Sequence, residues 1–203
     1  LGLTDAKAVA APGVKDGGKA VAEAMDDLEP AEASLYRQET GRCIYIALDR
    51  YDCQFVVRLL TQFLSRPRRL GLMRLKHLVK YLLGTRSWSW LFAWQSRPAA
   101  MVGDGDSDWA SDGETRRGVS SGLVVYGTRC PEHWVQGQQV VALSSGEAEF
   151  YAAGSTAVRL LFFVYLFLEV GHRVRATLRS DSSAARGVLR RAGPGRIRHL
   201  QTR

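Results

Sequence analysis

The sequence predicts an α/β protein: a mixed sheet flanked by helices and preceded by a helical hairpin. Apolar residues recur every three or four positions from Ser34 to Thr85, which is typical of helices. After Gly84 the pattern changes to short runs with alternating apolar residues, followed by a long apolar segment that ends near residue 169. Several strands followed by helix, strand and helix indicate a mixed sheet.

The first 33 residues are rich in Ala, Gly, Lys and Asp and have little periodicity. This composition predicts a flexible tether over residues 1–33. The sequence has no initiator Met and no signal segment at its start, so we expect a piece of a longer chain.

Residues 34–86 predict two helices. Pro67 disfavours helix in the residue before it, so we expect a break at Ser65–Pro67. Gly84 stands where a helix C-terminus is expected. The first apolar stripe comprises Ile44, Leu48, Tyr51, Phe55, Leu59, Gln62 and Phe63, and the second comprises Leu72, Leu75, Leu78, Val79, Leu82 and Leu83.

The sheet is expected within residues 87–203. Trp88, Trp90 and Phe92 alternate with other residues and predict a first strand. A long helix is expected at about 145–169, because this segment is apolar and long. The other expected strands are 100–106, 119–126, 133–135, 139–143 and about 174–180, and a short helix follows from about 182.

Charge and cysteine content narrow the class of protein. The formal net charge is +8 and the pI about 9.8, which favours nucleic-acid partners only weakly. Three cysteines without CxxC spacing argue against a disulfide framework and against a zinc site, so no disulfide partner is expected. The longest apolar run, Leu160–Leu168, is nine residues and too short to span a bilayer, so no membrane partner is expected.

Three acidic segments in the second half of the chain are candidates for a divalent-metal site. In the first segment, Asp104, Asp106 and Asp108 would share one face of a strand. Carboxylates on one face repel each other unless the strand ends or a cation is present. A solvated acidic turn explains this segment equally well.

The second segment contains Glu147 and Glu149. Ser144 and Glu147 have the spacing of a capping box, which is a sufficient structural role for Glu147. Glu147 is also in line with Tyr151, Gly154, Val158 and Leu161, a stripe that we expect to face the sheet. A carboxylate on a buried stripe is costly unless it is paired or metal-bound. Glu149 points elsewhere and is expected to be solvated.

The third segment contains Asp181, which follows an expected strand and precedes an expected helix. Asp is favoured as a helix N-cap, so a structural role is possible. The carboxyl end of a strand is also where sheet proteins place ligands. Because each segment puts an acid at the edge of an element, the three together predict a metal-dependent phosphoryl-transfer site.

Four motifs in this order resemble the ribonuclease H domain of copia-type LTR-retrotransposon Pol polyproteins. They are D-S-D-W-A-S-D (106–112), R-R-G-V-S-S-G (116–122), V-A-L-S-S-G-E-A-E-F (141–150) and S-D-S-S-A (180–184). The resemblance covers about 100–203. Upstream, L-T-D-A-K-A-V-A-A-P and the stretch from Tyr36 to Y-L-L-G-T resemble the tail of the reverse transcriptase of such polyproteins, although the polymerase motif is absent.

This resemblance implies a ribonuclease H-like fold for residues 87–203, truncated at its C-terminal end. It implies an endonuclease that cuts the RNA strand of an RNA/DNA hybrid with two Mg²⁺ ions, for which Mn²⁺ could substitute. By alignment, Asp106, Glu147 and Asp181 are the catalytic and metal-binding carboxylates. Asp108 is expected beside the site without binding the ions. The remaining partner is the rest of the polyprotein, and the location is intracellular, either cytoplasm or virus-like particles.

Substrate contacts are expected from basic and hydroxyl side chains around the carboxylates. These residues are Arg116, Arg117, Ser144, Ser145, Ser183, Arg198 and His199. The family carries a further acid where this chain has Gln201, which removes one negative charge from the predicted site. Two alternatives to an active nuclease therefore stay open: a catalytically impaired remnant that binds nucleic acid, and a translated fragment that does not fold stably.

Overall fold

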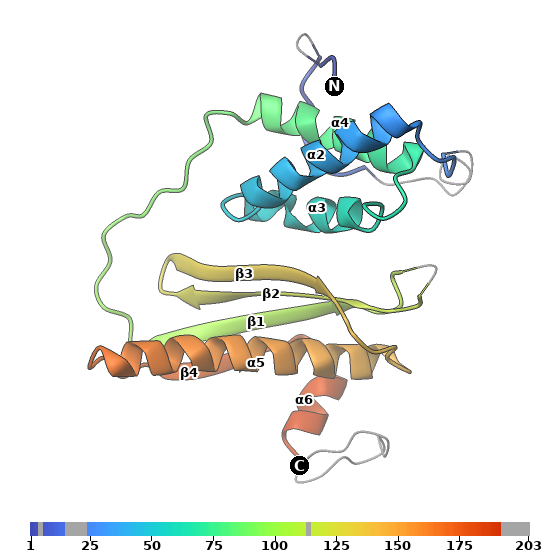
Figure 1. Ribbon diagram of the computed structural model, residues 1–203. Coiled ribbons are helices and arrows are strands. Elements are labelled where there is room, and N and C mark those ends of the chain that lie inside the picture. The colour runs from blue at the N-terminus through green and yellow to red at the C-terminus, as the bar shows by residue number, and fades with distance from the viewer. Residues whose placement is uncertain (4–5, 15–23, 113–114, 192–203) are drawn as a thin grey trace. The chain divides into compact units, whose positions relative to one another are not determined.

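The computed structural model describes residues 1–3, 6–14, 24–112 and 115–191 (Figure 1). The chain divides into two compact units, Leu1–Trp90 and Leu91–Arg203. In the part of the chain that the structure describes, the first unit is helical, and the second holds a four-stranded mixed sheet with two helices. The predicted α/β class is therefore confirmed. The unit boundary lies four residues beyond the boundary at residue 86 expected from the sequence.

The described residues of the first unit form three α-helices instead of the expected two. They are α2 (Pro30–Ile46), α3 (Gln54–Thr61) and α4 (Arg69–Gly84), with a short 3₁₀ helix, η1 (Tyr51–Cys53), before α3. The first predicted stripe crosses the break after α2, so its apolar residues do not share one face. Ile44, Leu48 and Phe55 are exposed as a result.

The core of the first unit forms where the three helices meet. Tyr36, Leu60, Leu75 and Leu78 are fully buried there. The Tyr36 hydroxyl donates to the Leu60 carbonyl oxygen at 2.7 Å, so its polar end is satisfied. The three helices thus enclose one apolar core.

The segment expected to be a tether also contributes to this unit. Leu28 is buried in the core, and Leu1 and Val9 pack against it. The backbone of Leu28 donates to the Pro67 carbonyl oxygen at 3.0 Å. The described part of residues 1–33 is therefore attached to the helices, contrary to the expectation of a loose tether, and its last residues begin α2.

The second unit is a sheet of strand order β3-β2-β1-β4. Its strands are β1 (Ala100–Asp108), β2 (Val119–Tyr126), β3 (Arg129–Gly137) and β4 (Arg175–Arg179). β1 and β3 pair antiparallel with β2, whereas β4 pairs parallel with β1. A parallel pair needs a crossover, and this connection contains the helix α5 (Ser145–Glu169). The last helix is α6 (Ser183–Leu189).

Most elements of this unit were predicted correctly, and two were not. The predicted strand 133–135 lies within the longer strand β3, which ends at Gly137, whereas residues 139–143 are not part of any strand. Trp88, Trp90 and Phe92 are exposed and lie outside any strand. Alternation alone does not make a strand here, because the described chain gives this segment no pairing partner.

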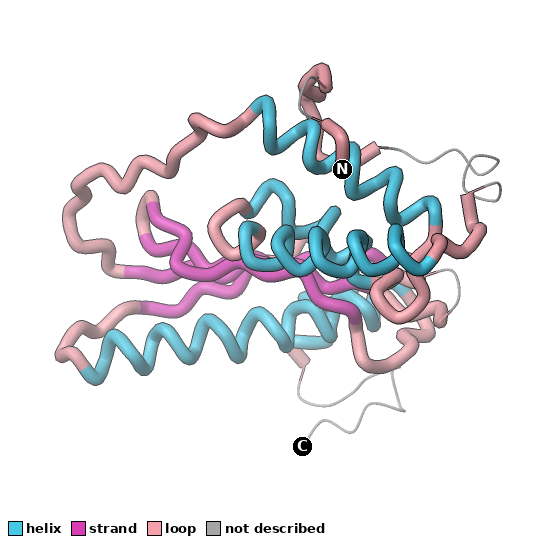
Figure 2. Tube along the Cα trace, turned by 45° about the horizontal axis from the view of Figure 1, so that its top comes forward, coloured by secondary structure: helices cyan, strands magenta, loops and turns pink. Residues whose placement is uncertain are grey.

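The helix α5 runs along one face of the sheet, beside β1, β2 and β4 (Figure 2). Close approach depends on Gly105, because a Cβ there would lie 2.2 Å from Thr156 Oγ1. The core between helix and sheet includes Met101, Val124, Trp134 and Leu160. By length and composition alone, α5 could also cross a membrane, a test that core helices of soluble proteins pass as well.

Candidate metal centre

The parallel pairing of β1 and β4 brings two of the acidic segments together. The last paired residues are Asp104 on β1 and Arg179 on β4. Asp106 lies two residues after Asp104, and Asp181 lies two residues after Arg179. Because the two strands are parallel, both acids reach the same edge of the sheet. Carboxyl ends of parallel strands are where sheet proteins place ligands. The expected convergence of Asp106 and Asp181 is observed.

The third carboxylate of this edge belongs to Glu149. This residue lies in the second turn of α5, whose first turns cover the carboxyl end of β1. One carboxylate oxygen from each of Asp106, Glu149 and Asp181 lies within 4.8 Å of the others. These three residues are called the carboxylate cluster below.

Glu149 is held in place by the end of β1. Its Oε1 accepts a hydrogen bond from Ser107 Oγ at 2.8 Å and a longer one from the Ser107 backbone N–H at 3.3 Å. Its Oε2 is buried and has no hydrogen-bond partner in the described structure. Burial raises the pKa of Glu149, and the negative charges of Asp106 and Asp181 raise it further, while the bonds from Ser107 oppose the shift.

Asp106 and Asp181 are exposed, and within the described residues their carboxylates form no hydrogen bond or ion pair. Asp104 differs, because its carboxylate accepts a hydrogen bond from Arg179 Nε at 2.6 Å. That pair removes Asp104 from the repulsive row predicted for β1. The negative charge of this edge is therefore concentrated in the carboxylate cluster.

Glu147 is not part of the carboxylate cluster, and the prediction that it joins Asp106 and Asp181 is wrong. Its side chain turns back to the start of α5, where Oε2 accepts from the Leu143 N–H at 2.9 Å. Its Oε1 accepts from the Tyr151 hydroxyl at 2.8 Å. The Ser144 hydroxyl accepts from the Glu147 N–H at 3.2 Å, as in the capping box that the spacing indicated. Glu147 thus has the structural role.

The error arose from the choice of helix face. Val158 and Leu161, expected to face the sheet, are 70% and 44% exposed. The face that packs on the sheet contains Ala152, Thr156 and Leu160, and Glu149 precedes these residues by three, seven and eleven positions. Small side chains at 152 and 156 opposite the glycines of β1 are the sequence feature that could have identified this face.

The other predicted site residues have varied positions. Asp108 ends β1 and is exposed, outside the carboxylate cluster. Arg116 and Arg117 are exposed in the loop that leads to β2. Ser144 is the N-cap of α5, and the exposed Ser145 and Ser183 are the first residues of α5 and α6. Arg198, His199 and Gln201 lie outside the described residues.

The donor set of the carboxylate cluster suits a hard divalent cation. All three side chains offer oxygen ligands, as Mg²⁺ and Mn²⁺ prefer. The unpartnered, buried Oε2 of Glu149 is the strongest indication, because a buried carboxylate oxygen without a partner is costly. A cation would also remove the mutual repulsion of the three charges. The residues present therefore fit a divalent metal.

Comparisons with known proteins identify the family. The chain is 30% identical to the retrovirus-related Pol polyprotein from transposon RE1 of Arabidopsis thaliana. The aligned region has 140 residues, which are 68% of this chain. It is 31% identical over 138 residues to the corresponding polyprotein from transposon RE2 of the same plant. The chain belongs to the family of retrotransposon Pol-derived proteins. No protein-family model matches this Pol-derived chain, and no solved structure matches it.

The Pol-derived chain spans about 9% of the length of the RE1 and RE2 polyproteins. It is also 34% identical over 118 residues to the secreted RxLR effector protein 161 of Plasmopara viticola. The aligned region covers 82% of that protein. The two sequences belong to the same family.

The Pol-derived chain has three free cysteines, two of them buried.

Proposed function

We propose that this chain is a ribonuclease H-type hydrolase that cuts the RNA strand of RNA/DNA hybrids with divalent cations, as part of a retrotransposon Pol polyprotein. The observation that carries the proposal is the carboxylate cluster, with its unpartnered Oε2 on Glu149. Similarity to Pol polyproteins supports the choice of nucleic acid as the substrate. The ligands proposed here are Asp106, Glu149 and Asp181.

Each carboxylate contributes something different to this chemistry. Bound divalent cations, one or two, would activate the attacking water and stabilise the leaving oxygen. Glu149 is fixed by Ser107 and partly buried, so it anchors the site against α5. Asp106 and Asp181 are exposed and can face a phosphate that arrives from solvent. The reaction adds one water across a phosphorus–oxygen bond of the RNA backbone.

Substrate contacts are proposed for the polar residues that surround the carboxylate cluster. Arg116 and Arg117 are exposed in the β1–β2 loop, where they can bind backbone phosphates. Ser145 and Ser183, whose side chains carry hydroxyl groups, are the first residues of the two helices that flank the carboxylate cluster. RNA is distinguished from DNA through shape and the 2′-hydroxyl, which such hydroxyl groups can bind.

The test is cleavage of an end-labelled RNA/DNA hybrid by the full 203-residue chain in Mg²⁺ or Mn²⁺, with EDTA as the blank. Asp106→Asn, Asp181→Asn and Glu149→Gln should each lower the rate at least about a hundredfold, as expected for ligands of a catalytic metal. Glu147→Gln is the matched control, because it also neutralises an acid of α5 but lies outside the carboxylate cluster.

Two results would contradict the proposal. One is the absence of metal-dependent cleavage at high protein concentration. The other is equal cleavage by the wild-type protein and by Asp106→Asn. Salt-dependent binding of the hybrid without cleavage would instead support the impaired, nucleic-acid-binding alternative.

A further inference from the structure

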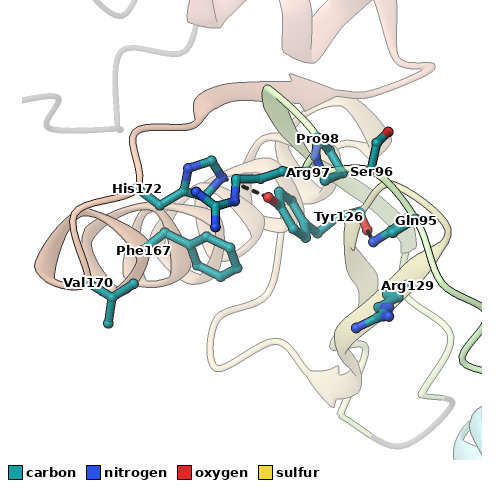
Figure 3. A pocket seen from close by; sticks show the side chains of 9 residues that line it. All are labelled: Gln95, Ser96, Arg97, Pro98, Tyr126, Arg129, Phe167, Val170 and His172. Carbon is teal, nitrogen blue, oxygen red and sulfur yellow. Dashed lines mark hydrogen bonds between the residues drawn. The ribbon is translucent and has the colours of Figure 1, made fainter.

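A pocket lies at the opposite end of the sheet from the carboxylate cluster. Its volume is about 350 Å³, and Figure 3 shows the side chains that line it. Tyr126 on β2 is one of them. Asp106 of the carboxylate cluster pairs with Ser121, which lies on β2 five residues before Tyr126. Five steps along a strand span roughly 17 Å. The pocket is therefore separate from the carboxylate cluster.

Positive charge dominates the lining of this pocket. Arg97 and Arg129 line it, and none of its lining residues is acidic. Among the described residues neither guanidinium forms an ion pair, and Arg129 donates only a long hydrogen bond of 3.3 Å to the Ala93 carbonyl oxygen. The C-terminus of α5 adds about half a negative charge, which two full positive charges exceed. The pocket should therefore attract an anion.

An aromatic wall gives the pocket a second character. Phe167 and Tyr126 pack edge to face with ring centroids 4.8 Å apart, and His172 completes this side. The Tyr126 hydroxyl and His172 Nε2 are 2.7 Å apart and form a hydrogen bond. Aromatic rings next to guanidinium groups suit a ligand that combines a planar ring with a negative group.

The wall is held by two local structures. Gly171 adopts a left-handed conformation (φ +76°) after α5, and the N–H of His172 donates to the Phe167 carbonyl oxygen at 2.8 Å. This is the Schellman ending of a helix, and it fixes His172 beside Phe167. On the other side, Gln95 donates to the Tyr126 carbonyl oxygen at 3.1 Å and accepts from the Thr128 N–H at 2.7 Å.

We propose that this pocket binds a nucleotide, whose phosphate is attracted by the positive charges of Arg97 and Arg129 and whose base lies against Phe167 and Tyr126. A volume of about 350 Å³ lies in the range of small-molecule sites. The nucleotide is either free or the 5′-terminal nucleotide of a strand, since both present the same phosphate and base. The inference goes beyond the proposed nuclease and does not depend on it.

Isothermal titration calorimetry of the full chain in EDTA, where the carboxylate cluster carries no metal, tests the proposal. The probes are AMP, adenosine and inorganic phosphate. AMP should bind more tightly than either part. Arg97→Gln and Arg129→Gln should each weaken AMP binding about tenfold, the lower end for a charged hydrogen bond that solvent reaches. Phe167→Leu should remove the preference for AMP over phosphate.

The matched control is Arg190→Gln, which removes the same charge from the exposed end of α6. It should change AMP affinity less than about twofold, as for a screened surface charge. Among the described residues Arg97 forms no hydrogen bond or ion pair, so its replacement should not unfold the chain, and the melting temperature of each variant checks this. No AMP binding, or equal weakening by Arg97→Gln and Arg190→Gln, would overturn the proposal.

A 5′-phosphorylated oligonucleotide and its 5′-hydroxyl counterpart distinguish the two sources. If the ligand is a strand end, the phosphorylated oligonucleotide should bind more tightly, and Arg97→Gln should abolish the difference. If the ligand is a free nucleotide, only AMP should depend on Arg97. Asp106→Asn should leave AMP affinity unchanged, so failure of the nuclease proposal and failure of this one are separable.

Discussion

The hydroxyl of Ser107 donates to Oε1 of Glu149 at 2.8 Å and joins the helix α5 to the end of β1. Ser107 directly follows Asp106 in the chain, so this bond sets Glu149 beside the first acid of the carboxylate cluster. The other oxygen of Glu149 is buried without a partner. One contact between a strand and a helix therefore creates both the geometry of the candidate metal centre and its electrostatic cost.

Replacing Glu149 with Gln should stabilise the metal-free protein and remove its response to metal. The amide keeps the bond from Ser107 but removes a buried charge that Asp106 and Asp181 repel. Without metal at pH 7, we expect a rise in melting temperature of about 1–4 °C. Mg²⁺ or Mn²⁺ should raise the melting temperature of the wild type by mass action but not that of the variant. Differential scanning calorimetry measures both, and an unchanged metal response in Glu149→Gln would contradict the assignment.

The pH dependence of stability should carry the same signature. The folded-state pKa of Glu149 is raised above its ordinary value of 4.5, so the folded protein holds this proton more tightly than the unfolded chain. The stability that protonated Glu149 contributes is complete below about pH 4.5, and it is lost as the pH rises through the raised pKa of the folded state. In urea unfolding from pH 4 to 8 in EDTA, the difference in stability between the wild type and Glu149→Gln should therefore grow as the pH rises above about 4.5 and level off above the raised folded pKa. Parallel curves would show that the shift is absent.

Glu147→Ala should lower stability without changing metal affinity. The substitution leaves the Leu143 N–H and the Tyr151 hydroxyl without their acceptor. Loss of a buried capping interaction costs about 1–3 kcal/mol in the free energy of unfolding. The pKa of Tyr151, raised to about 12 by burial and by the bond to Glu147, should fall in the variant. Urea unfolding, alkaline absorbance titration and Mn²⁺ titration measure the three quantities, and a large loss of Mn²⁺ affinity would return Glu147 to the metal site.

The contrast between Glu147 and Glu149 shows where sequence reasoning succeeds and where it ends. The acidic segments, the capping box and the bounds of α5 follow from local spacing, and the structure confirms them. The choice between two glutamates does not, because α5 is apolar on several faces and its outer side exposes Val158, Phe162 and Tyr165. Periodicity cannot then identify the face that packs on the sheet, whereas the close approach of Thr156 to Gly105 does so in three dimensions.

Gly105→Ala should destabilise the second unit, whereas Gly154→Ala should not. A Cβ at 105 would lie 2.2 Å from Thr156 Oγ1 and 3.3 Å from the Ala152 backbone oxygen, so α5 would have to shift. Overpacking of this kind costs about 1–3 kcal/mol. Gly154 has no atom within 4 Å of its added Cβ and is helical, so alanine there should be neutral or stabilise by up to about 1 kcal/mol. Urea unfolding of both variants tests the comparison, and equal stability would mean that α5 does not approach β1 this closely.

The buried thiols of the first unit should resist modification and make that unit sensitive to alkali. Burial raises the pKa of Cys43 from 9.0 to about 11, which leaves about a hundredfold less thiolate at neutral pH. Burial likewise raises the pKa of Cys53 and of Tyr36 to about 12. Because the folded-state values are raised, the stability that these neutral groups contribute is complete below about pH 9 and is lost as the pH rises toward 12. Mass spectrometry after iodoacetamide treatment should find Cys43 and Cys53 modified at least about tenfold more slowly than after unfolding in urea. Rapid labelling of either cysteine in the folded chain would contradict their burial in the core of the first unit.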